Sequence, residues 1–200
     1  MNAHVAISAV LVTAPTSEPV TPEEAKAQAR ITGADSDDLI ASYIKTAREE
    51  AEDYLNYGLL TQTWRADLSE FAESIPLPRA MKLQSITHVK YYDSDGTLQT
   101  LSNTYYETDT VSRPARLVRA ADMSWPSLQA DRRIGRVQVT YVIGWTTAAL
   151  VPERIKHGIK MFVSYLDADR DGLDVQASAA RIAAERCWSD RLYELPVVCE

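Results

Sequence analysis

The sequence has little cysteine, little glycine and no long apolar run. Its two cysteines, Cys187 and Cys199, are too few for a disulfide framework, and we expect free thiols in a reducing compartment. The longest uncharged apolar stretch, residues 5–12, is far shorter than the ~20 residues that a helix needs to cross a bilayer. No Lys or Arg lies in the first twelve residues, so a secretory signal is not expected. Seven glycines among 200 residues argue against glycine-rich loops that cradle phosphates.

Acidic side chains are in excess, and the charge is unevenly distributed. With 21 basic and 28 acidic residues the net charge is −7, so a general affinity for nucleic acid through charge neutralisation is not expected. Residues 1–57 hold 10 acidic and 4 basic side chains, whereas residues 111–136 hold 2 acidic and 6 basic ones. The basic stretch either pairs with the chain's own acids on a solvated surface or meets the acidic helices of the next copy. Its arginines are the candidate subunit-interface residues: Arg113, Arg116, Arg119, Arg132, Arg133 and Arg136.

Two helices are predicted near the N-terminus. The first covers about residues 21–30, because Thr21 is a good N-cap and Glu24 completes a capping box. A longer amphipathic helix follows and is expected to end at Gly58. Its apolar residues recur with the helical period that places them on one face, namely Leu39, Ile40, Tyr43, Ile44, Ala47, Ala51, Tyr54 and Leu55.

The helical period returns in the last quarter of the chain. A helix begins at residues 151–153, with Pro152 in its first turn, and stops at residues 167–172. A last helix is predicted at about residues 176–193. Between the two helical regions, alternating and β-branched segments predict strands, including a hairpin with its turn at residues 93–96.

The order of these elements predicts an α+β fold. Helices of residues 21–60 and 150–193 are expected to form a small helical bundle, and residues 61–149 an antiparallel β-rich insert of five or six strands. Residues 1–20 are expected to form an extended N-terminal arm, and residues 194–200 a C-terminal tail.

Few residues suggest metal chemistry. Residues 167–172 (DADRDG) match the first half of a calcium-binding loop, but Ser178 stands where that loop needs a bidentate Glu. A solvated turn between helices is therefore the better interpretation. The histidines have no cysteine at ligand spacing, which speaks against a zinc site; they are His4, His88 and His157.

The carboxylate pairs do not suggest catalysis either. Glu49 with Glu50, and Glu52 with Asp53, are expected to lie on a helix and to face water. The sequence holds no recognisable pairing of a nucleophile with a base. We therefore expect no enzymatic activity and no cofactor.

Four stretches in the first third of the chain stand out: residues 20–26 (VTPEEAK), 37–40 (DDLI), 51–56 (AEDYLN) and 60–64 (LTQTW). Two further stretches follow near the end of the predicted sheet, residues 139–145 (VTYVIGW) and 151–156 (VPERIK). Together they resemble the head–tail connector (adaptor or head-completion) family of long-tailed phages and related gene-transfer particles. The resemblance covers about residues 20–65 and 137–167.

The resemblance implies a structural neck protein of a virion or phage-like particle, assembled in the bacterial cytoplasm. It implies a ring of copies, twelve in number, that docks on the portal and joins the head to a stopper or tail-proximal protein. DNA would pass through the ring without sequence-specific binding, and no membrane would be involved. The alternative is a binding or regulatory module unrelated to virions.

The C-terminal residues are apolar although they lie at a chain end. Residues 195–198 (LPVV) are expected to be extended, and Pro196 cannot lie inside a central strand. Either the tail folds back onto its own domain, or it docks to a partner, for which the resemblance implies the portal. The candidate docking residues are Leu192, Tyr193, Leu195, Val197 and Val198.

Overall fold

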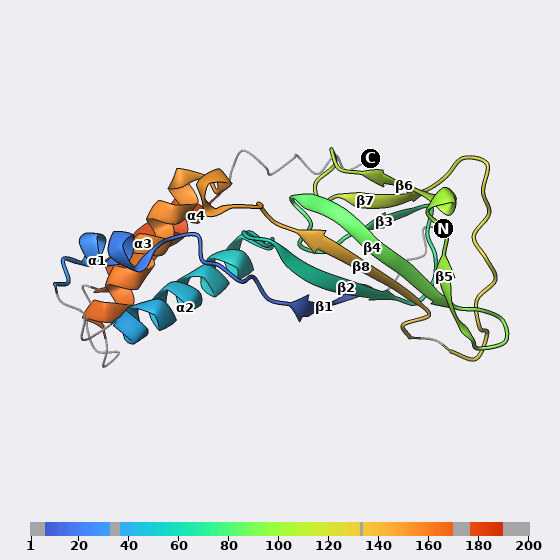
Figure 1. Cartoon of the computed structure of the whole chain (residues 1–200), viewed down its shortest axis with the longest axis horizontal. Coiled ribbons are helices and arrows are strands. Elements are labelled where there is room, and N and C mark those ends of the chain that lie inside the picture. Colours follow the sequence, from blue (N-terminus) through green and yellow to red (C-terminus); the bar gives the residue numbers. More distant parts are fainter. Residues whose placement is uncertain (1–6, 33–36, 133, 170–176, 190–200) are drawn as a thin grey trace. The chain divides into compact units, whose positions relative to one another are not determined.

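A computed structural model describes residues 7–32, 37–132, 134–169 and 177–189. The chain divides into two compact units, each built from two separate stretches of sequence. We call the first the β unit (residues 1–16 and 61–145) and the second the helical unit (residues 17–60 and 146–200). Helices and antiparallel sheets are both present, which confirms a mixed α+β fold (Figure 1).

In its described residues the helical unit contains four α-helices. The third of them, α3, packs against the other three (Figure 1). Its apolar face buries Ile155, Ile159 and Val163, and Gly158 lies where it meets the last helix. A methyl group at Gly158 would collide with the indole of Trp188, so the glycine permits this close packing. The helices are α1 (Pro22–Ala29), α2 (Asp37–Leu55), α3 (Glu153–Ala168) and α4 (Ala177–Trp188).

The predicted capping box at the start of α1 is confirmed. Thr21 Oγ1 accepts a hydrogen bond from the Glu24 amide at 3.2 Å, and the Thr21 amide donates to the Glu24 carboxylate at 3.0 Å. The predicted end of α2 at Gly58 is wrong. The helix ends at Leu55, because Asn56 adopts a left-handed conformation with φ of 54°.

The β unit contains two antiparallel sheets in its described residues, where the sequence predicted one. Side-chain alternation predicts strands but not which strands pair, so the split could not be foreseen. The larger sheet has the order β1 (Ile7–Thr13), β2 (Gln62–Leu68), β8 (Val137–Ile143), β4 (Leu83–Tyr92) and β5 (Leu98–Leu101). The smaller sheet has the order β3 (Ser74–Pro76), β7 (Arg116–Arg119) and β6 (Tyr106–Asp109).

The N-terminal arm expected over residues 1–20 is not separate from the fold. Residues 7–13 form β1, which pairs with β2 at the edge of the larger sheet (Figure 1). Residues 17–20 belong to the helical unit. The uncharged, β-branched composition of residues 7–13 suits a strand, but its partner strand lies fifty or more positions away in the sequence.

Both sheets contribute to one apolar core. Ile75 and Leu117 of the smaller sheet are buried together with Ala66 and Val139 of the larger one. Tyr141 places its ring in this core and donates its hydroxyl hydrogen bond to the Pro78 carbonyl at 2.7 Å. Burial raises the pKa of this phenol well above its usual range.

The hairpin predicted around residues 93–96 is confirmed. It joins β4 to β5, and Gly96 supplies the left-handed conformation that the turn requires, with φ of 80°. One Asp93 carboxylate oxygen accepts the amide hydrogens of Asp95 at 3.1 Å and Thr97 at 2.9 Å. Hydrogen bonds from Gln99 and from these amides lower the pKa of Asp93, so the turn favours the ionised carboxylate.

Candidate functional site

Two of the six candidate interface arginines are exposed. Arg113 lies in the loop between β6 and β7, and Arg116 begins β7. The loop is held by Asp109, whose carboxylate accepts the amide hydrogens of Val111 at 2.9 Å and Ser112 at 3.0 Å. This geometry presents Arg113 and Arg116 to solvent, where a partner could reach them.

Three other candidate arginines hold parts of the β unit together. Arg119 pairs with Glu73 at 2.6 Å. The guanidinium of Arg132 lies 4.0 Å from the ring centroid of Tyr92, a cation–π contact. Arg136 is half-buried and donates to the backbone carbonyls of Gln129, at 3.3 Å, and Ser69.

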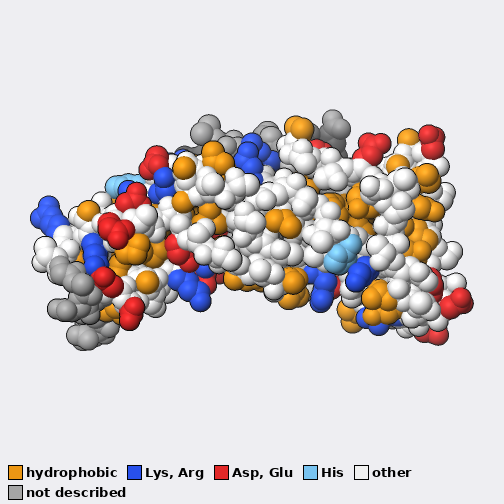
Figure 2. Space-filling model, viewed as in Figure 1, with side chains coloured by type: hydrophobic (Ala, Val, Ile, Leu, Met, Phe, Trp, Pro, Cys, Tyr) orange, Lys and Arg blue, Asp and Glu red, His pale blue; other side chains and the backbone are white. Residues whose placement is uncertain are grey.

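The sixth arginine, Arg133, lies outside the described residues. On the face seen in Figure 2, acidic and basic side chains lie interspersed. The structure therefore favours local pairing for Arg119 and Arg136, while Arg113 and Arg116 remain the better candidates for contact with another molecule. The tail residues Leu192, Tyr193, Leu195, Val197 and Val198 also lie outside the described residues.

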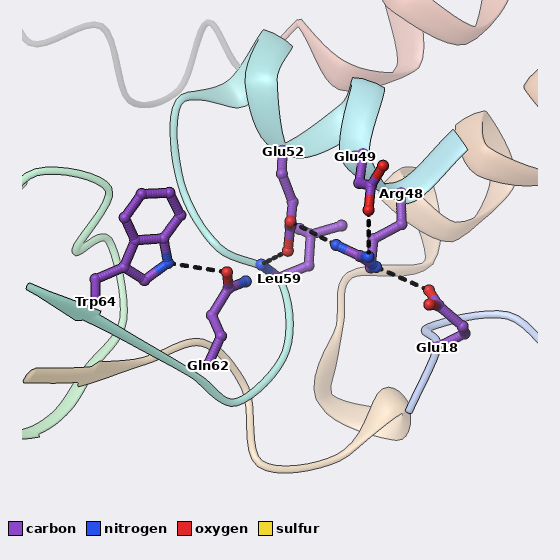
Figure 3. Close-up of polar contacts among 7 residues, drawn as sticks. All are labelled: Glu18, Arg48, Glu49, Glu52, Leu59, Gln62 and Trp64. Carbon is purple, nitrogen blue, oxygen red and sulfur yellow. Dashed lines mark hydrogen bonds and ion pairs between the residues drawn. The ribbon is translucent and has the colours of Figure 1, made fainter. Parts of the chain in front are cut away.

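A buried cluster of charged side chains lies at the inner face of α2 (Figure 3). Arg48, only 4% exposed, reaches Glu52 at 2.7 Å and Glu18 at 2.9 Å. It also contacts Glu49 at 3.2 Å. The other oxygen of Glu52 accepts the amide hydrogen of Leu59 at 2.7 Å. The cluster thus ties the segment before α1 and the segment after α2 to the same turn of helix.

The expectation that the carboxylates of residues 49–53 face water is wrong for one of them. Glu49, Glu50 and Asp53 are exposed, but Glu52 is 5% exposed. Its position four residues after Arg48 places both side chains on the same face of α2, next to the buried stripe. A buried arginine needs such a partner, because an unpaired charge in the interior is strongly unfavourable.

Glu18 adds a third side to the cluster. Burial raises its pKa, and the neighbouring Arg48 guanidinium acts in the opposite direction. The net rise means that the proton is bound more tightly in the folded protein than in the unfolded chain. The ion pair of Glu18 with Arg48 is therefore lost as the pH falls through the raised pKa of Glu18.

The segment that leaves α2 contains the stretch LTQTW of the sequence resemblance. Gln62 is buried, and its side-chain oxygen accepts the indole hydrogen of Trp64 at 2.9 Å (Figure 3). The guanidinium of Arg79 lies 5.0 Å from the Trp64 ring centroid. The Gln and Trp of this stretch are therefore fixed by contacts within the β unit.

The end of the stretch VTYVIGW is held by hydrogen bonds within the β unit. Gly144 follows β8 with φ of 97°, a conformation that favours glycine. Gln84 donates from its side-chain amide to the Gly144 carbonyl at 2.9 Å and to the Thr61 hydroxyl at 2.8 Å. Thr61 in turn donates to the Trp145 carbonyl at 3.3 Å. The two strand ends, at residues 61 and 144, are thus joined through side chains.

Across the described ranges, no group of three or more His, Cys, Asp or Glu residues is arranged to hold a metal ion. Asp167 and Ala168 belong to α3, and Asp169 follows it; residues 170–172 of the DADRDG segment lie outside those ranges. None of the helices described is both long enough and apolar enough to cross a membrane. The contacts of Arg48, Gln62 and Gln84 described above hold backbone segments in place.

Sequence reasoning missed the Arg48 cluster. The signal was present, because Arg48 and Glu52 are spaced by four and lie beside the apolar positions Ile44, Ala47 and Ala51. Glu18 could not have been assigned, since its contact with Arg48 joins residues 30 positions apart.

Comparison with known families gives a match over residues 20–113 to the phage gp6-like head-tail connector protein family. The matched region runs from the segment before α1 to the loop between β6 and β7. It contains the stretch LTQTW and the Arg48 cluster except for Glu18, which lies just before the matched region. This match confirms the resemblance to head–tail connectors that the sequence predicted.

Three solved structures share the fold. A chain from the virion of a native gene transfer agent particle and a chain from the neck of an empty particle, computed with C6 symmetry, each align with a TM-score of 0.72. A chain from the neck of a native particle, computed with C12 symmetry, aligns with a TM-score of 0.65. Each is 16% identical, and each alignment covers 90% of this chain and 94% of the other. No curated protein matches the sequence.

Proposed function

We propose that this chain, which matches the head–tail connectors over residues 20–113, is a structural neck protein of a phage or phage-like particle. It acts as an adaptor that docks on the portal and joins the DNA-filled head to a stopper or tail protein. The observation that carries the proposal is the family match, which includes the contacts of Glu52 with Arg48 and with the segment after α2. The likeness of the fold to chains of gene transfer agent particles supports it.

The adaptor works as a ring of identical copies. Two of the similar chains come from necks computed with C6 and C12 symmetry, which agrees with a ring of twelve. A ring needs one heterologous interface that is repeated until it closes. In this proposal the helices of residues 21–60 and 150–193 act as one small bundle, with the β unit as its insert.

The ring surrounds a channel for DNA and does not read its sequence. The net charge of −7 disfavours adhesion of phosphates, because carboxylates and phosphates repel each other. The exposed arginines Arg113 and Arg116 serve contacts between copies, facing acidic residues such as Glu49, Glu50 and Asp53 of a neighbour. No cofactor and no catalytic step are needed for this role.

The C-terminal tail is the part that docks on the portal. Its apolar residues, with Pro196 among them, suit an extended segment that inserts into a groove or adds to a sheet edge of the partner. Deleting residues 195–200 should leave the thermal stability of the isolated chain within ~1 °C and abolish its attachment to portal rings. A deletion that unfolds the chain would show that the tail belongs to the core.

The function as a whole is tested by assembling particles without this chain. Heads should still fill with DNA but remain without tails, and adding the purified chain should restore tail attachment. Particles of normal morphology made in its absence would contradict the proposal. A defect in gene expression with normal particles would point to the regulatory alternative.

A further inference from the structure

Among the described residues the strand β1 forms an open edge of the larger sheet, and that edge is apolar. Val10, Leu11 and Val12 are 45%, 43% and 54% exposed, although all three are large hydrophobic residues. They lie in the uncharged stretch of residues 5–12 that the sequence analysis singled out. On its other side β1 is paired with β2 at every residue except Val12.

An exposed apolar edge strand is unusual in a monomeric protein. An edge strand presents unpaired backbone N–H and C=O groups, and proteins normally protect it with charged residues, proline or a very short strand. Residues 7–13 (ISAVLVT) contain no charge and no proline. The strand has seven residues and one irregularity of register, between Leu11 and Thr13.

One face of β1 lies on the side of the sheet that holds the core of the β unit. Leu11 lies opposite Trp64 in the register, on the face that carries the buried residues Ala66 and Leu68 of β2. Leu11 is nevertheless 43% exposed. A further strand beside β1 would cover Leu11 on one face and Val10 and Val12 on the other, and would satisfy the open backbone groups.

A second copy of the chain carries a matching edge. Among the described strands with an open edge, β3 contains Pro76, and β6 contains Glu107 and Asp109. The strand β5 (LQTL) is uncharged, lies at the opposite edge of the same sheet and exposes 43% of Leu98. It is therefore the edge that β1 of another copy fits best.

We propose that β1 of each copy pairs with β5 of the next, so that the larger sheets join from copy to copy. Neighbours in the sheet are antiparallel throughout, so β1 and β5 point the same way, and copies related by a small rotation would pair them in parallel. The two edges differ, which is the heterologous contact that a ring requires. The inference rests on the proposed ring, and it names the surfaces that close it.

Lysines on the edge test the proposal directly. In the full-length chain, Val10→Lys with Val12→Lys should weaken self-association by about tenfold or more, because the charges would be buried beside the added strand. Leu98→Lys should have a similar effect. The matched control is Ser124→Lys, at an exposed side chain in the loop between β7 and β8 of the same unit, and it should associate like the wild type. Sedimentation velocity from micromolar to millimolar concentration measures all four chains.

A second experiment identifies the paired strands. With Cys187 and Cys199 replaced by serine, a chain carrying Val12→Cys is mixed with one carrying Thr100→Cys and mildly oxidised. Disulfide-linked heterodimers are expected. Homodimers of the Val12→Cys chain would show that β1 pairs with itself and would overturn the assignment to β5.

The outcomes separate this inference from the proposed function. A wild-type chain that stays monomeric at millimolar concentration, or a lysine variant that associates normally, overturns the strand pairing. If the lysine variant still forms rings on the portal, the adaptor function stands and the pairing alone fails. If the wild-type chain does not bind portal rings, the proposed function fails as well.

Discussion

The two units of the molecule treat buried polar groups differently. In the described helical unit the buried polar residues are charged, namely Arg48, Glu52 and Lys156. In the described β unit they are Gln62 and Thr140, which are neutral. The described arginines of the β unit are exposed or half-buried. Arg136, for example, is half-buried and donates a hydrogen bond to the backbone carbonyl of Gln129.

Because of this difference, we expect different kinds of substitution to destabilise the two units. A buried ion pair contributes little net stability but becomes very costly when one partner is lost. An apolar core loses stability in proportion to the volume removed. We therefore expect substitutions that remove a buried charge without changing the side-chain shape to destabilise the helical unit. In the β unit, we expect charge changes to be tolerated at arginines that make no hydrogen bond to a loop carbonyl.

The largest effect is expected from Glu52→Gln. The substitution keeps the shape and an acceptor for the Leu59 amide but leaves the buried Arg48 with only its more exposed acidic partners. It should lower the free energy of unfolding by about 3 kcal/mol. Urea denaturation measures it. The control is Glu50→Gln, on the exposed side of α2, which should change stability by less than about 0.5 kcal/mol. Equal effects of the two variants would contradict the role of the cluster.

The second-largest change in stability is expected from a substitution at the contact between α3 and α4. By helix propensity alone, Gly158→Ala should stabilise α3 by up to about 1 kcal/mol. Because a methyl group there would collide with Trp188, we expect instead a loss of about 2 kcal/mol and a change in Trp188 fluorescence. The sign of the measured change decides between the two. A stabilised variant would mean that the close packing of α3 and α4 is wrong.

In the β unit, a half-buried arginine and an exposed one should differ in their effect on stability. Arg136→Glu should destabilise by about 1.5 kcal/mol, because it removes hydrogen bonds from a charged group to the Ser69 and Gln129 carbonyls. Arg116→Glu, at an exposed side chain, should leave stability within about 0.5 kcal/mol. Thermal unfolding of both variants tests this. The Arg116 variant is then the suitable probe of contacts between copies, at low salt, where charge pairing is least screened.

The smallest effect concerns acidification, to which Glu18 should respond with the opposite sign to Asp93 and Asp109. The raised pKa of Glu18 means that its contribution to stability increases as pH falls through its folded value. Hydrogen bonds from backbone amides and neighbouring side chains lower the pKa of Asp93 and of Asp109, so their stabilisation is present above about pH 4 and is lost below it.

Hydrogen exchange between pH 7 and pH 3 can follow both units in one experiment. Relative to wild type, Glu18→Gln should remove the acid-dependent gain in α2. Asp93→Asn should remove the acid-dependent loss in the hairpin between β4 and β5. If both units lose protection in parallel, and the variants behave as the wild type does, the assigned pKa directions are wrong.

The sequence predicted what depends on local pattern. The capping box of Thr21 and Glu24, the hairpin at Asp93 and the presence of helices before and after a β-rich middle region follow from spacing within a few residues. What it missed depends on distant pairs. The pairing of β1 with β2 and the contact of Glu18 with Arg48 join separate stretches, and no local period indicates them.

Electron cryo-microscopy of purified portal rings mixed with the full-length chain tests most directly the proposal that this chain is a ring-forming adaptor of the neck. We expect a symmetric ring of copies added to one end of the portal, with a continuous channel, and loss of that ring when residues 195–200 are deleted. Portal rings that remain bare at saturating concentrations of the wild-type chain would contradict it.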